Sequence, residues 1–228
     1  RPRVSLSPGP PDANHSDGVE VTTGPLGQGF ANAVGLAMAQ ANAAAAFNKD
    51  GFELFNNRTY VFLGDGCMQE GVASEAASMA GHLGLKNLIA FYDDNHITID
   101  GDTNCAFTED VGKRFESYNW NVLTVKNGDE DLSALWHAIV KAQQEKERPT
   151  LVCVQTTIGF GSLNQGKASV HGAPLKEDDI AQLKTKFGFN PEEKFVVPHD
   201  VRDAFKSYAD RGAAKHAESL TLFEDYGK

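Results

Sequence analysis

The sequence predicts an α/β fold, a parallel sheet with helices on both faces, and three observations lead to this class. Short apolar segments alternate with longer segments of helical periodicity between residues 28 and 156. The apolar segments carry few polar positions, as strands buried on both sides do. Polar or glycine-rich stretches at 64–70, 93–97 and 157–171 follow apolar segments, and α/β sheets bind ligands at such carboxyl ends of strands.

The expected elements follow the chain in order. Residues 1–23 are rich in Pro, Gly, Asp and Ser and predict a loop segment. Residues 28–47 are alanine-rich with interspersed larger apolar side chains, which indicates a buried helix. The remaining patterns predict strands at 60–63, 87–92, 122–125 and 151–156, and helices at 70–83, 108–116 and 132–146.

The ends of two helical regions need separate comment. The helix at 108–116 has a start that resembles a capping box, with Thr108 as its first residue. Residues 176–228 predict two or three further helices, with a break near 188–198 where Gly and Pro occur. Between these regions, the glycine-containing segment 157–174 is expected to form a long functional loop.

Composition excludes several classes of function. The 228 residues include 21 Lys and Arg against 31 Asp and Glu, a formal net charge of −10, whereas nucleic-acid-binding proteins present a basic surface. No stretch reaches the roughly 18 consecutive apolar residues of a membrane span. The three cysteines lack CxxC spacing, and we expect reduced thiols in a cytoplasmic protein. We therefore expect neither nucleic acid nor a membrane as partner.

The strongest local motif is Gly64-Asp65-Gly66, directly after an expected strand. The glycines allow the backbone to approach a ligand closely, and Asp65 offers a hard oxygen to a divalent cation. The expected helix start near Glu70 presents free N–H groups and the positive end of the helix dipole to a phosphate. The alternative is an ordinary turn in which Asp65 caps the helix.

A second strand end favours the metal interpretation. Asn95 follows Gly66 by 29 positions, one strand–helix–strand unit later, so the two side chains of Asp65 and Asn95 can meet at adjacent strand ends. Together with a nearby backbone carbonyl they would supply three oxygens. Mg²⁺ takes octahedral oxygen ligation and completes it with phosphate oxygens and water. The sequence therefore predicts a site for Mg²⁺ and a diphosphate.

These motifs resemble those of transketolase. Gly-Asp-Gly followed one unit later by Asn is similar to the thiamine diphosphate signature, and the resemblance covers about nine-tenths of the chain, from about residue 18 onwards. The similar segments are 19–29 (VEVTTGPLGQG), 64–71 (GDGCMQEG), 92–95 (YDDN), 99–101 (IDG) and 170–175 (VHGAPL). The resemblance implies the thiamine-diphosphate-binding fold, with residues 24–228 as the diphosphate-binding domain and residues 176–228 as its C-terminal helical extension.

The resemblance also implies an activity. Transketolases use thiamine diphosphate and Mg²⁺ to transfer a two-carbon ketol unit between sugar phosphates, and the pyrimidine-binding domain that completes the site comes from the same or a second chain of a homodimer. The present chain ends before that domain and starts after the first strand and helices of the family's domain. We therefore expect it to supply the diphosphate and metal half of the site and to be inactive alone.

Site residues are carried over from the matching motifs. The metal, Mg²⁺ or Ca²⁺ in its place, would be held by Asp65, Asn95 and the carbonyl of Ile97. His171 would contact the diphosphate, face the reacting centre and act in catalysis by hydrogen bonding or proton transfer. The residues implied in cofactor binding are Gly24 and Leu26 near the aminopyrimidine, Gly66, Asn95 and His171 at the diphosphate, Ile158 beside the cofactor, and Glu70 at the dimer contact.

Two positions depart from the family pattern, and two alternatives stay open. Where the family has a histidine in a Pro-Gly-His-Pro segment, this chain has proline at 10 and 11, and a family lysine after Asn95 is His96 here. A split or degenerate homologue that binds cofactor without catalysis is therefore the alternative function. A P-loop at 161–168 is the remote one, because Ala168 lacks the required hydroxyl.

Overall fold

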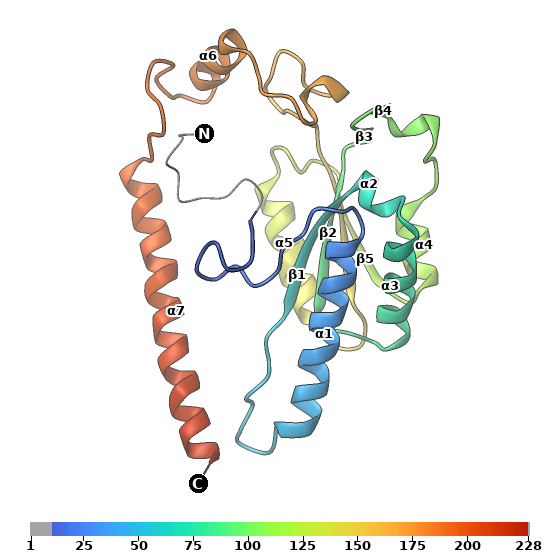
Figure 1. Ribbon diagram of the computed structural model, residues 1–228, viewed down its shortest axis with the longest axis vertical. Coiled ribbons are helices and arrows are strands. Elements are labelled where there is room, and N and C mark those ends of the chain that lie inside the picture. Colours follow the sequence, from blue (N-terminus) through green and yellow to red (C-terminus); the bar gives the residue numbers. More distant parts are fainter. Residues whose placement is uncertain (1–10, 228) are drawn as a thin grey trace.

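A parallel sheet forms the centre of the protein, which is described here by a computed structural model covering residues 11–227. Within these residues the sheet has four strands in the order β1-β2-β6-β5, all parallel (Figure 1). The strands are β1 Thr59–Gly64, β2 Leu88–Asp94, β5 Asn121–Val125 and β6 Thr150–Gln155. A short antiparallel hairpin, β3 Ile97–Thr98 with β4 Gly101–Asp102, follows β2. The predicted α/β class with a parallel sheet is confirmed.

Helices lie on both faces of the sheet, as the sequence predicts. The α-helices are α1 Gln28–Phe47, α2 Asp65–Met68, α3 Gly71–His82, α4 Val111–Ser117, α5 Leu132–Gln144, α6 Glu177–Lys186 and α7 His199–Tyr226. Two 3₁₀ turns, η1 Thr103–Cys105 and η2 Ala168–Val170, complete the regular structure. Residues 11–27 form turns and extended loop, whereas the part of the expected N-terminal loop at 1–10, including Pro10, lies outside the described residues.

Two helix starts differ from the sequence expectation. The helix α4 begins at Val111 because the Oδ1 atom of Asp110 accepts a hydrogen bond from the backbone N–H of Lys113 at 3.0 Å. Asp110, and not Thr108, is therefore the N-cap. The single turn α2, which precedes α3, was not predicted, because four residues are too few to show a periodicity.

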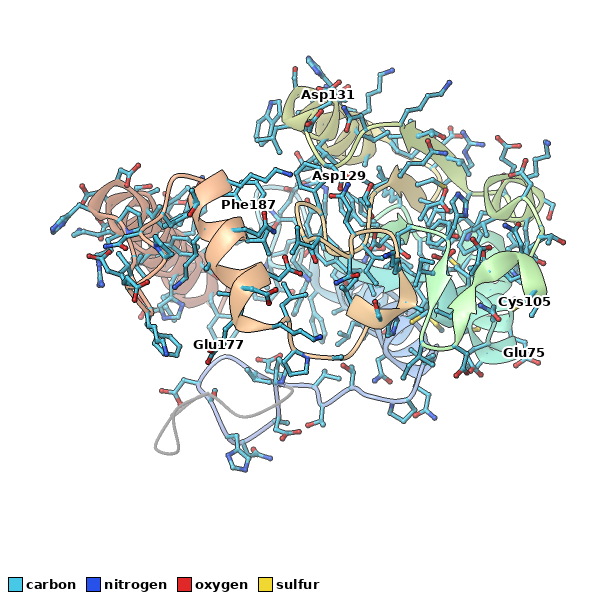
Figure 2. The ribbon with its side chains drawn as sticks, turned by 90° about the horizontal axis from the view of Figure 1, so that it is seen from above. Glu75, Cys105, Asp129, Asp131, Glu177 and Phe187 are labelled. Carbon is cyan, nitrogen blue, oxygen red and sulfur yellow. The ribbon has the colours of Figure 1, made fainter. Side chains whose placement is uncertain are left out.

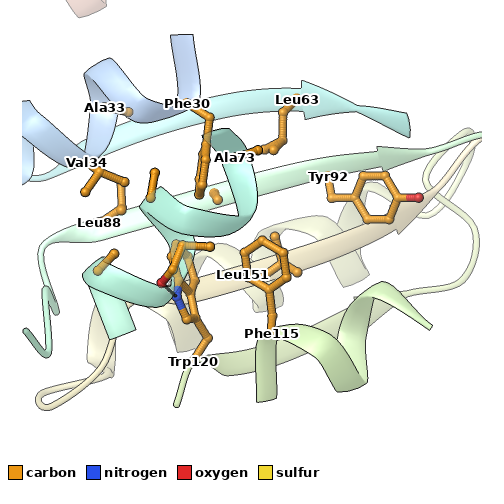
Figure 3. Packing of buried hydrophobic residues seen from close by; sticks show 14 of the residues in the cluster. Phe30, Ala33, Val34, Leu63, Ala73, Leu88, Tyr92, Phe115, Trp120 and Leu151 are labelled. Atoms are coloured by element: carbon orange, nitrogen blue, oxygen red, sulfur yellow. Dashed lines mark hydrogen bonds between the residues drawn. The ribbon is translucent and has the colours of Figure 1, made fainter. Parts of the chain in front are cut away.

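Most of the apolar core lies on one face of the sheet. In β2 the side chains of Leu88, Ala90 and Tyr92 point to this face, against α1, α3 and α4. Ile89 and Phe91 point to the other face, where α5 packs on β5 and β6. This alternation follows from the period of two in a strand. Figure 3 shows the first of these clusters, with Phe30, Leu88 and Trp120 among its labelled side chains.

Three aromatic rings join the helices of that face. Phe30 of α1 lies with its ring centroid 6.3 Å from Phe115 of α4 and 6.0 Å from Trp120, and Phe115 and Trp120 meet edge to face at 5.0 Å. The indole N–H of Trp120 donates to the carbonyl of Ala77 in α3 at 2.8 Å. This cluster fixes α1, α3 and α4 relative to one another and to the strands that they cover.

The last helix is built differently from the rest. All side chains of α7 stay partly or fully exposed. Near its end, the ring of Tyr226 packs edge to face on Phe52. Figure 1 shows α7 as a long rod beside the sheet, connected through α6. At 28 residues it is long enough to cross a membrane, yet within residues 11–227 no helix is sufficiently apolar to do so.

Candidate functional site

The carboxyl ends of β1 and β2 bring the two predicted motifs together. The strands pair in parallel with Leu63 opposite Tyr92 and Gly64 opposite Asp93, so the turn at 64–66 lies beside the segment 92–97. We call these two segments the Asp65 corner. Figure 1 shows that α2 and the β3–β4 hairpin stand together at this end of the sheet. Parallel pairing thus produces the adjacency that the spacing of Asp65 and Asn95 predicts.

Asp65 is the central residue of this corner. Its side chain is 2 % exposed, and its Oδ1 accepts a hydrogen bond from the hydroxyl of Tyr92 at 2.6 Å. Its Oδ2 is fully buried and has no hydrogen-bond partner among the described residues. Asp65 therefore does not act as the simple helix cap that the alternative interpretation required, since its free oxygen meets no backbone N–H.

The environment of Asp65 opposes its negative charge. Burial raises the pKa of the Asp65 carboxyl above its ordinary value, and the charge of Asp94 adds to this. The Tyr92 hydroxyl, His96 and the backbone N–H of Asn95 act in the opposite direction. A buried carboxylate oxygen without a donor is costly, and a cation at Oδ2 would remove that cost. The site therefore fits a metal ion.

A cleft of about 390 Å³ opens beside Asp65. Its walls include Tyr92 and Asp94 of β2, His96, and Cys153 of β6. Burial, followed by the charge of Asp94, raises the pKa of the Cys153 thiol to about 12. Burial therefore disfavours the thiolate, which is the form of cysteine that binds metals. Carboxylate oxygens and the imidazole of His96 are the remaining ligands there.

The two neighbouring aspartates of β2 face opposite sides of the sheet. Asp94 faces the cleft, and its Oδ1 lies 3.5 Å from Nδ1 of His96. Asp93 faces the other side, where it accepts hydrogen bonds from the Thr156 hydroxyl and, at 3.1 Å, from Nδ2 of Asn95. Asp94 thus adds its negative charge to the Asp65 corner, while Asp93 joins the end of β2 to the segment after β6.

Asn95 and Ile97, the other predicted metal ligands, lie in the same corner. The side-chain Oδ1 of Asn95 accepts a hydrogen bond from the backbone N–H of Ile97 at 3.0 Å. The strand β3, which begins at Ile97, packs against α2, which begins at Asp65. The structure therefore brings Asp65, Asn95 and Ile97 together, with the Asn95 oxygen engaged in a local turn.

A second group of predicted residues gathers around Gly66. A Cβ atom at Gly66 would lie 3.0 Å from Cδ1 of Leu26, so Leu26 covers the Gly-Asp-Gly turn. Gly27 has a φ of +79° and approaches Glu70 so closely that a Cβ atom there would lie 2.8 Å from the Glu70 Cβ. Leu26, Gly66 and Glu70 thus form one surface, and exposed Gly24 lies two residues before Leu26.

Ile158 and His171 belong to the segment 156–176, which we call the His171 loop. Its contacts are largely its own: the Ile158 carbonyl accepts from the Gly166 N–H at 2.8 Å, and Val170 packs against Gly159, whose φ is +64°. His171 follows η2 and is exposed, and Ile158 is half-buried. The described contacts bring neither side chain to Asp65.

The helix α6 holds this loop from the other side. Asp179 accepts hydrogen bonds from the Ser162 hydroxyl at 2.6 Å and from the Leu163 N–H at 3.0 Å. These bonds, the Ser162 bond first, hold the pKa of Asp179 below its usual value. Figure 2, which looks onto this end of the molecule, shows α6 with Glu177 and Phe187 at its two ends, beside the loop.

The P-loop alternative is wrong. A P-loop requires a helix directly after its lysine, but Lys167 is followed by the three-residue turn η2, and α6 begins only at Glu177. The ammonium group of Lys167 lies 3.4 Å from Oδ1 of Asn164 within the same loop. The loop therefore lacks the strand–loop–helix geometry that would bind a nucleoside triphosphate.

Sequence reasoning missed two residues of the site. Tyr92 was noted as part of a motif, but its bond to Asp65 depends on the pairing of Leu63 with Tyr92 across two strands. Arg114 of α4 donates to the Met68 carbonyl at 3.0 Å and forms an ion pair with Glu109 at 2.6 Å. It holds the end of α2, and nothing in the sequence distinguishes Arg114 from Lys113, the cation beside it in α4.

Comparison with known proteins agrees with this geometry. The family model described as transketolase, thiamine diphosphate binding domain, matches residues 1–228. Transketolase 1 of Saccharomyces cerevisiae is 59% identical over 225 residues, which are 98% of this chain and 33% of that protein. The structure of transketolase from Leishmania mexicana matches with a TM-score of 0.95 at 48% identity, covering 98% of this chain and 33% of that one.

A third match is a crystal structure of a Pichia stipitis transketolase in complex with sedoheptulose 7-phosphate. It has a TM-score of 0.90 at 56% identity and covers 92% of this chain and 31% of its own. The present chain thus spans about a third of the length of the relatives that it matches.

Proposed function

Because the chain belongs to the transketolase family, as its thiamine diphosphate binding domain, we propose that it supplies the diphosphate and metal half of a transketolase active site. The observation that carries this proposal is the free, buried Oδ2 of Asp65 at the carboxyl ends of β1 and β2. A carboxylate in that state fits a cation, and the glycine turn beside it fits a diphosphate.

Mg²⁺ is the proposed metal, with Ca²⁺ able to take its place. Asp65, Asn95 and the Ile97 carbonyl would hold it, and diphosphate oxygens would complete its oxygen ligation. The proximity of β3 to α2 and of the Asn95 backbone to Asp65 supports this set. The net charge of −10 makes such a cation more important, since few basic groups are present to balance a diphosphate.

The other proposed contacts surround the cofactor. Gly66 would let the diphosphate approach the backbone, and Leu26 and Gly24 would border the aminopyrimidine. Ile158 would pack beside the cofactor, and Glu70 would lie at a dimer contact. When bound, thiamine diphosphate supplies the electron sink for breaking and forming the carbon–carbon bond. His171 would contact the diphosphate and, through a ring nitrogen, donate to an oxygen of the substrate on which negative charge develops.

The complete activity is proposed as transfer of a two-carbon ketol unit between sugar phosphates. Its support is the family membership and the Pichia stipitis transketolase structure, which is a complex of that protein with sedoheptulose 7-phosphate. A pyrimidine-binding domain, from the same or a second chain of a homodimer, would complete the site. We propose that residues 24–228 act as one diphosphate-binding domain, with 176–228 as a helical extension, in a cytoplasmic enzyme.

A specific departure from the family favours a second candidate function. Pro11, and Pro10 outside the described residues, occupy the segment where the family has a histidine. Loss of that imidazole would leave cofactor binding intact while impairing the handling of substrate. The second candidate is therefore a module that binds cofactor without turnover.

Calorimetry of thiamine diphosphate binding tests the first proposal. The 228-residue chain should bind the cofactor only in the presence of Mg²⁺, and Asp65→Ala should abolish this binding while circular dichroism stays unchanged. Asp203→Ala, which removes an exposed carboxylate of α7, is the matched control. Equal cofactor affinity of Asp65→Ala and the parent chain would contradict the metal assignment.

A mixing assay separates the two candidate functions. The chain is combined with a transketolase pyrimidine-binding domain, and ketol transfer from a ketose phosphate is measured. Activity in the mixture, absent from either component, supports the split active site. Mg²⁺-dependent cofactor binding without activity in the mixture supports the non-catalytic module.

A further inference from the structure

His96 offers a third metal-binding atom in the Asp65 corner, beside the carboxylates of Asp65 and Asp94. The ligand atoms of Asp65, Asp94 and His96 all lie within 4.8 Å of one another, so that small side-chain rotations would bring them onto one ion. Neither Asp94 nor His96 belongs to the ligand set proposed above for Mg²⁺. Both line the same cleft of about 390 Å³.

The free oxygen of Asp65 is the independent sign that an ion belongs here. Its Oδ2 is buried and has no donor within residues 11–227, while its Oδ1 is held by the Tyr92 hydroxyl. Oδ2 is therefore the Asp65 oxygen that is free to bind a cation. Exposed acidic side chains alone would carry no such implication, because water satisfies them.

The backbone places the imidazole of His96 toward these carboxylates. His96 has a φ of +60°, in the left-handed region, and its carbonyl accepts from the Thr103 N–H at 3.0 Å. Its Nδ1 lies 3.5 Å from Oδ1 of Asp94. Asp94 is mostly buried, with 16% of its side chain exposed, whereas 64% of the His96 ring is exposed and able to turn onto an ion.

Two carboxylates and one imidazole form a mixed oxygen and nitrogen set. Mg²⁺ and Ca²⁺ take oxygen ligands, whereas imidazole suits the later first-row transition cations. The family lysine at this position offers an ammonium group, which cannot ligate a metal. We propose that His96, with Asp65 and Asp94, forms a nitrogen-containing cation site in this chain, in which the imidazole raises the preference for a transition dication such as Co²⁺ over Mg²⁺. This inference rests on the proposed metal site at Asp65.

The test must isolate the contribution of the imidazole. Almost any site binds Co²⁺ more tightly than Mg²⁺, so the decisive quantity is the change in the ratio of the two affinities when His96 is replaced. His96→Asn is the best variant, because Asn tolerates a left-handed backbone and carries no imidazole. His82→Asn, at an exposed histidine of α3, is the control.

Calorimetry with CoCl₂ and with MgCl₂, together with the visible absorption of bound Co²⁺, gives the readout. His96→Asn should weaken Co²⁺ about tenfold or more, change Mg²⁺ by less than about twofold, and shift the Co²⁺ absorption bands. Asp94→Asn should weaken both cations. His82→Asn should match the parent chain in every measurement.

Two outcomes would overturn the inference, and each is distinct from failure of the proposed function. Unchanged Co²⁺ affinity and absorption in His96→Asn would exclude the imidazole as a ligand, even while Mg²⁺-dependent cofactor binding persists. Equal weakening of Co²⁺ and Mg²⁺ would show a general effect on the loop and no nitrogen preference. Failure of the proposed function would instead appear as full Mg²⁺ and cofactor binding in Asp65→Ala.

Discussion

The Asp65 corner and the His171 loop both follow strands of the same sheet, but they are held in different ways. In the corner, Asp65 is buried and its neighbours are fixed by the parallel pairing of β1 with β2. Beyond Thr156 and Thr157, which are bonded to Asp93 and Asp129, the His171 loop is held by its own turns and by Asp179 of α6, and His171 itself is exposed. The corner is therefore preorganised for an ion, while most of the His171 loop depends on contacts outside the sheet.

This difference implies different sensitivities to mutation. Changes at the buried residues of the corner, Asp65 and Tyr92, should affect both folding and cation binding. Changes in the loop should leave the unfolding free energy nearly constant and act locally. Four substitutions, from the largest expected effect to the smallest, examine this contrast.

The largest effect is expected for Gly27→Ala. Gly27 has a φ of +79°, and a Cβ atom there would lie 2.8 Å from the Glu70 Cβ and 2.9 Å from Cγ1 of Val72. Backbone strain and the clash together should lower the unfolding free energy by about 3 kcal/mol, as measured by urea denaturation. Gly35→Ala, at an open helical position of α1, should be neutral or stabilising. An unfolding free energy equal to that of the parent chain would show that the close contact of Gly27 with Glu70 and Val72 does not stabilise the fold.

Arg114→Ala should come next. The guanidinium donates to the Met68 carbonyl and to the Ser74 hydroxyl, and it pairs with Glu109. Loss of these bonds should cost about 2 kcal/mol and weaken Mg²⁺ binding by releasing the end of α2. Lys113→Ala, which removes an exposed neighbouring cation, is the control for charge. Calorimetry measures the Mg²⁺ affinity and urea denaturation the unfolding free energy. Unchanged Mg²⁺ affinity would show that Arg114 does not support the Asp65 corner.

Tyr92→Phe removes a single hydroxyl. The Oδ1 of Asp65 then loses its donor at 2.6 Å, which should cost about 1 kcal/mol and weaken Mg²⁺ about tenfold because the carboxylate is no longer oriented. Tyr60→Phe, at an exposed position of β1, is the matched control. Mg²⁺ affinity equal to that of the parent chain would mean that Asp65 is oriented without Tyr92.

Asp179→Asn should have the smallest effect on global stability. Hydrogen bonds from Ser162 and Leu163 hold the pKa of Asp179 below its usual value. Its contribution to stability is therefore present above the unfolded-state pKa of about 3.9 and is lost as the pH falls through the lower folded-state value. The substitution should speed hydrogen exchange in residues 161–165 at neutral pH, with Mg²⁺ affinity unchanged. Weaker Mg²⁺ binding or faster exchange in β1 would contradict the independence of the two regions.

The sheet could be predicted from the sequence, and so could the position of Asp65 and Asn95 at adjacent strand ends. Each strand showed as a short apolar run, and one strand–helix–strand unit between Gly66 and Asn95 was enough to place both at the same edge. Periodicity is a property of neighbouring residues, so it is available without the fold. The start of α4 was not predicted correctly. Thr108, Glu109 and Asp110 are all polar, and only the folded backbone shows that Asp110 is the residue that caps the helix.

Other features required distances that only the folded chain provides. The bond from Tyr92 to Asp65 joins residues 27 apart across two strands. The left-handed backbone of His96 follows from the closure of the β3–β4 hairpin, and nothing in residues 92–97 indicates it in advance. Likewise, the path of the His171 loop depends on Asp179, which lies in a helix that begins after the loop ends.

The central claim is that Asp65 is kept as a buried carboxylate for a cation, at a cost to the fold. Thermal unfolding of Asp65→Asn, with and without Mg²⁺ and thiamine diphosphate, tests it directly. Burial raises the pKa of Asp65, so the neutral amide should raise the Tm of the metal-free chain at pH 7, and the increase in Tm on adding ligand should disappear. A lower Tm for the metal-free variant, together with a retained shift on adding ligand, would contradict the claim.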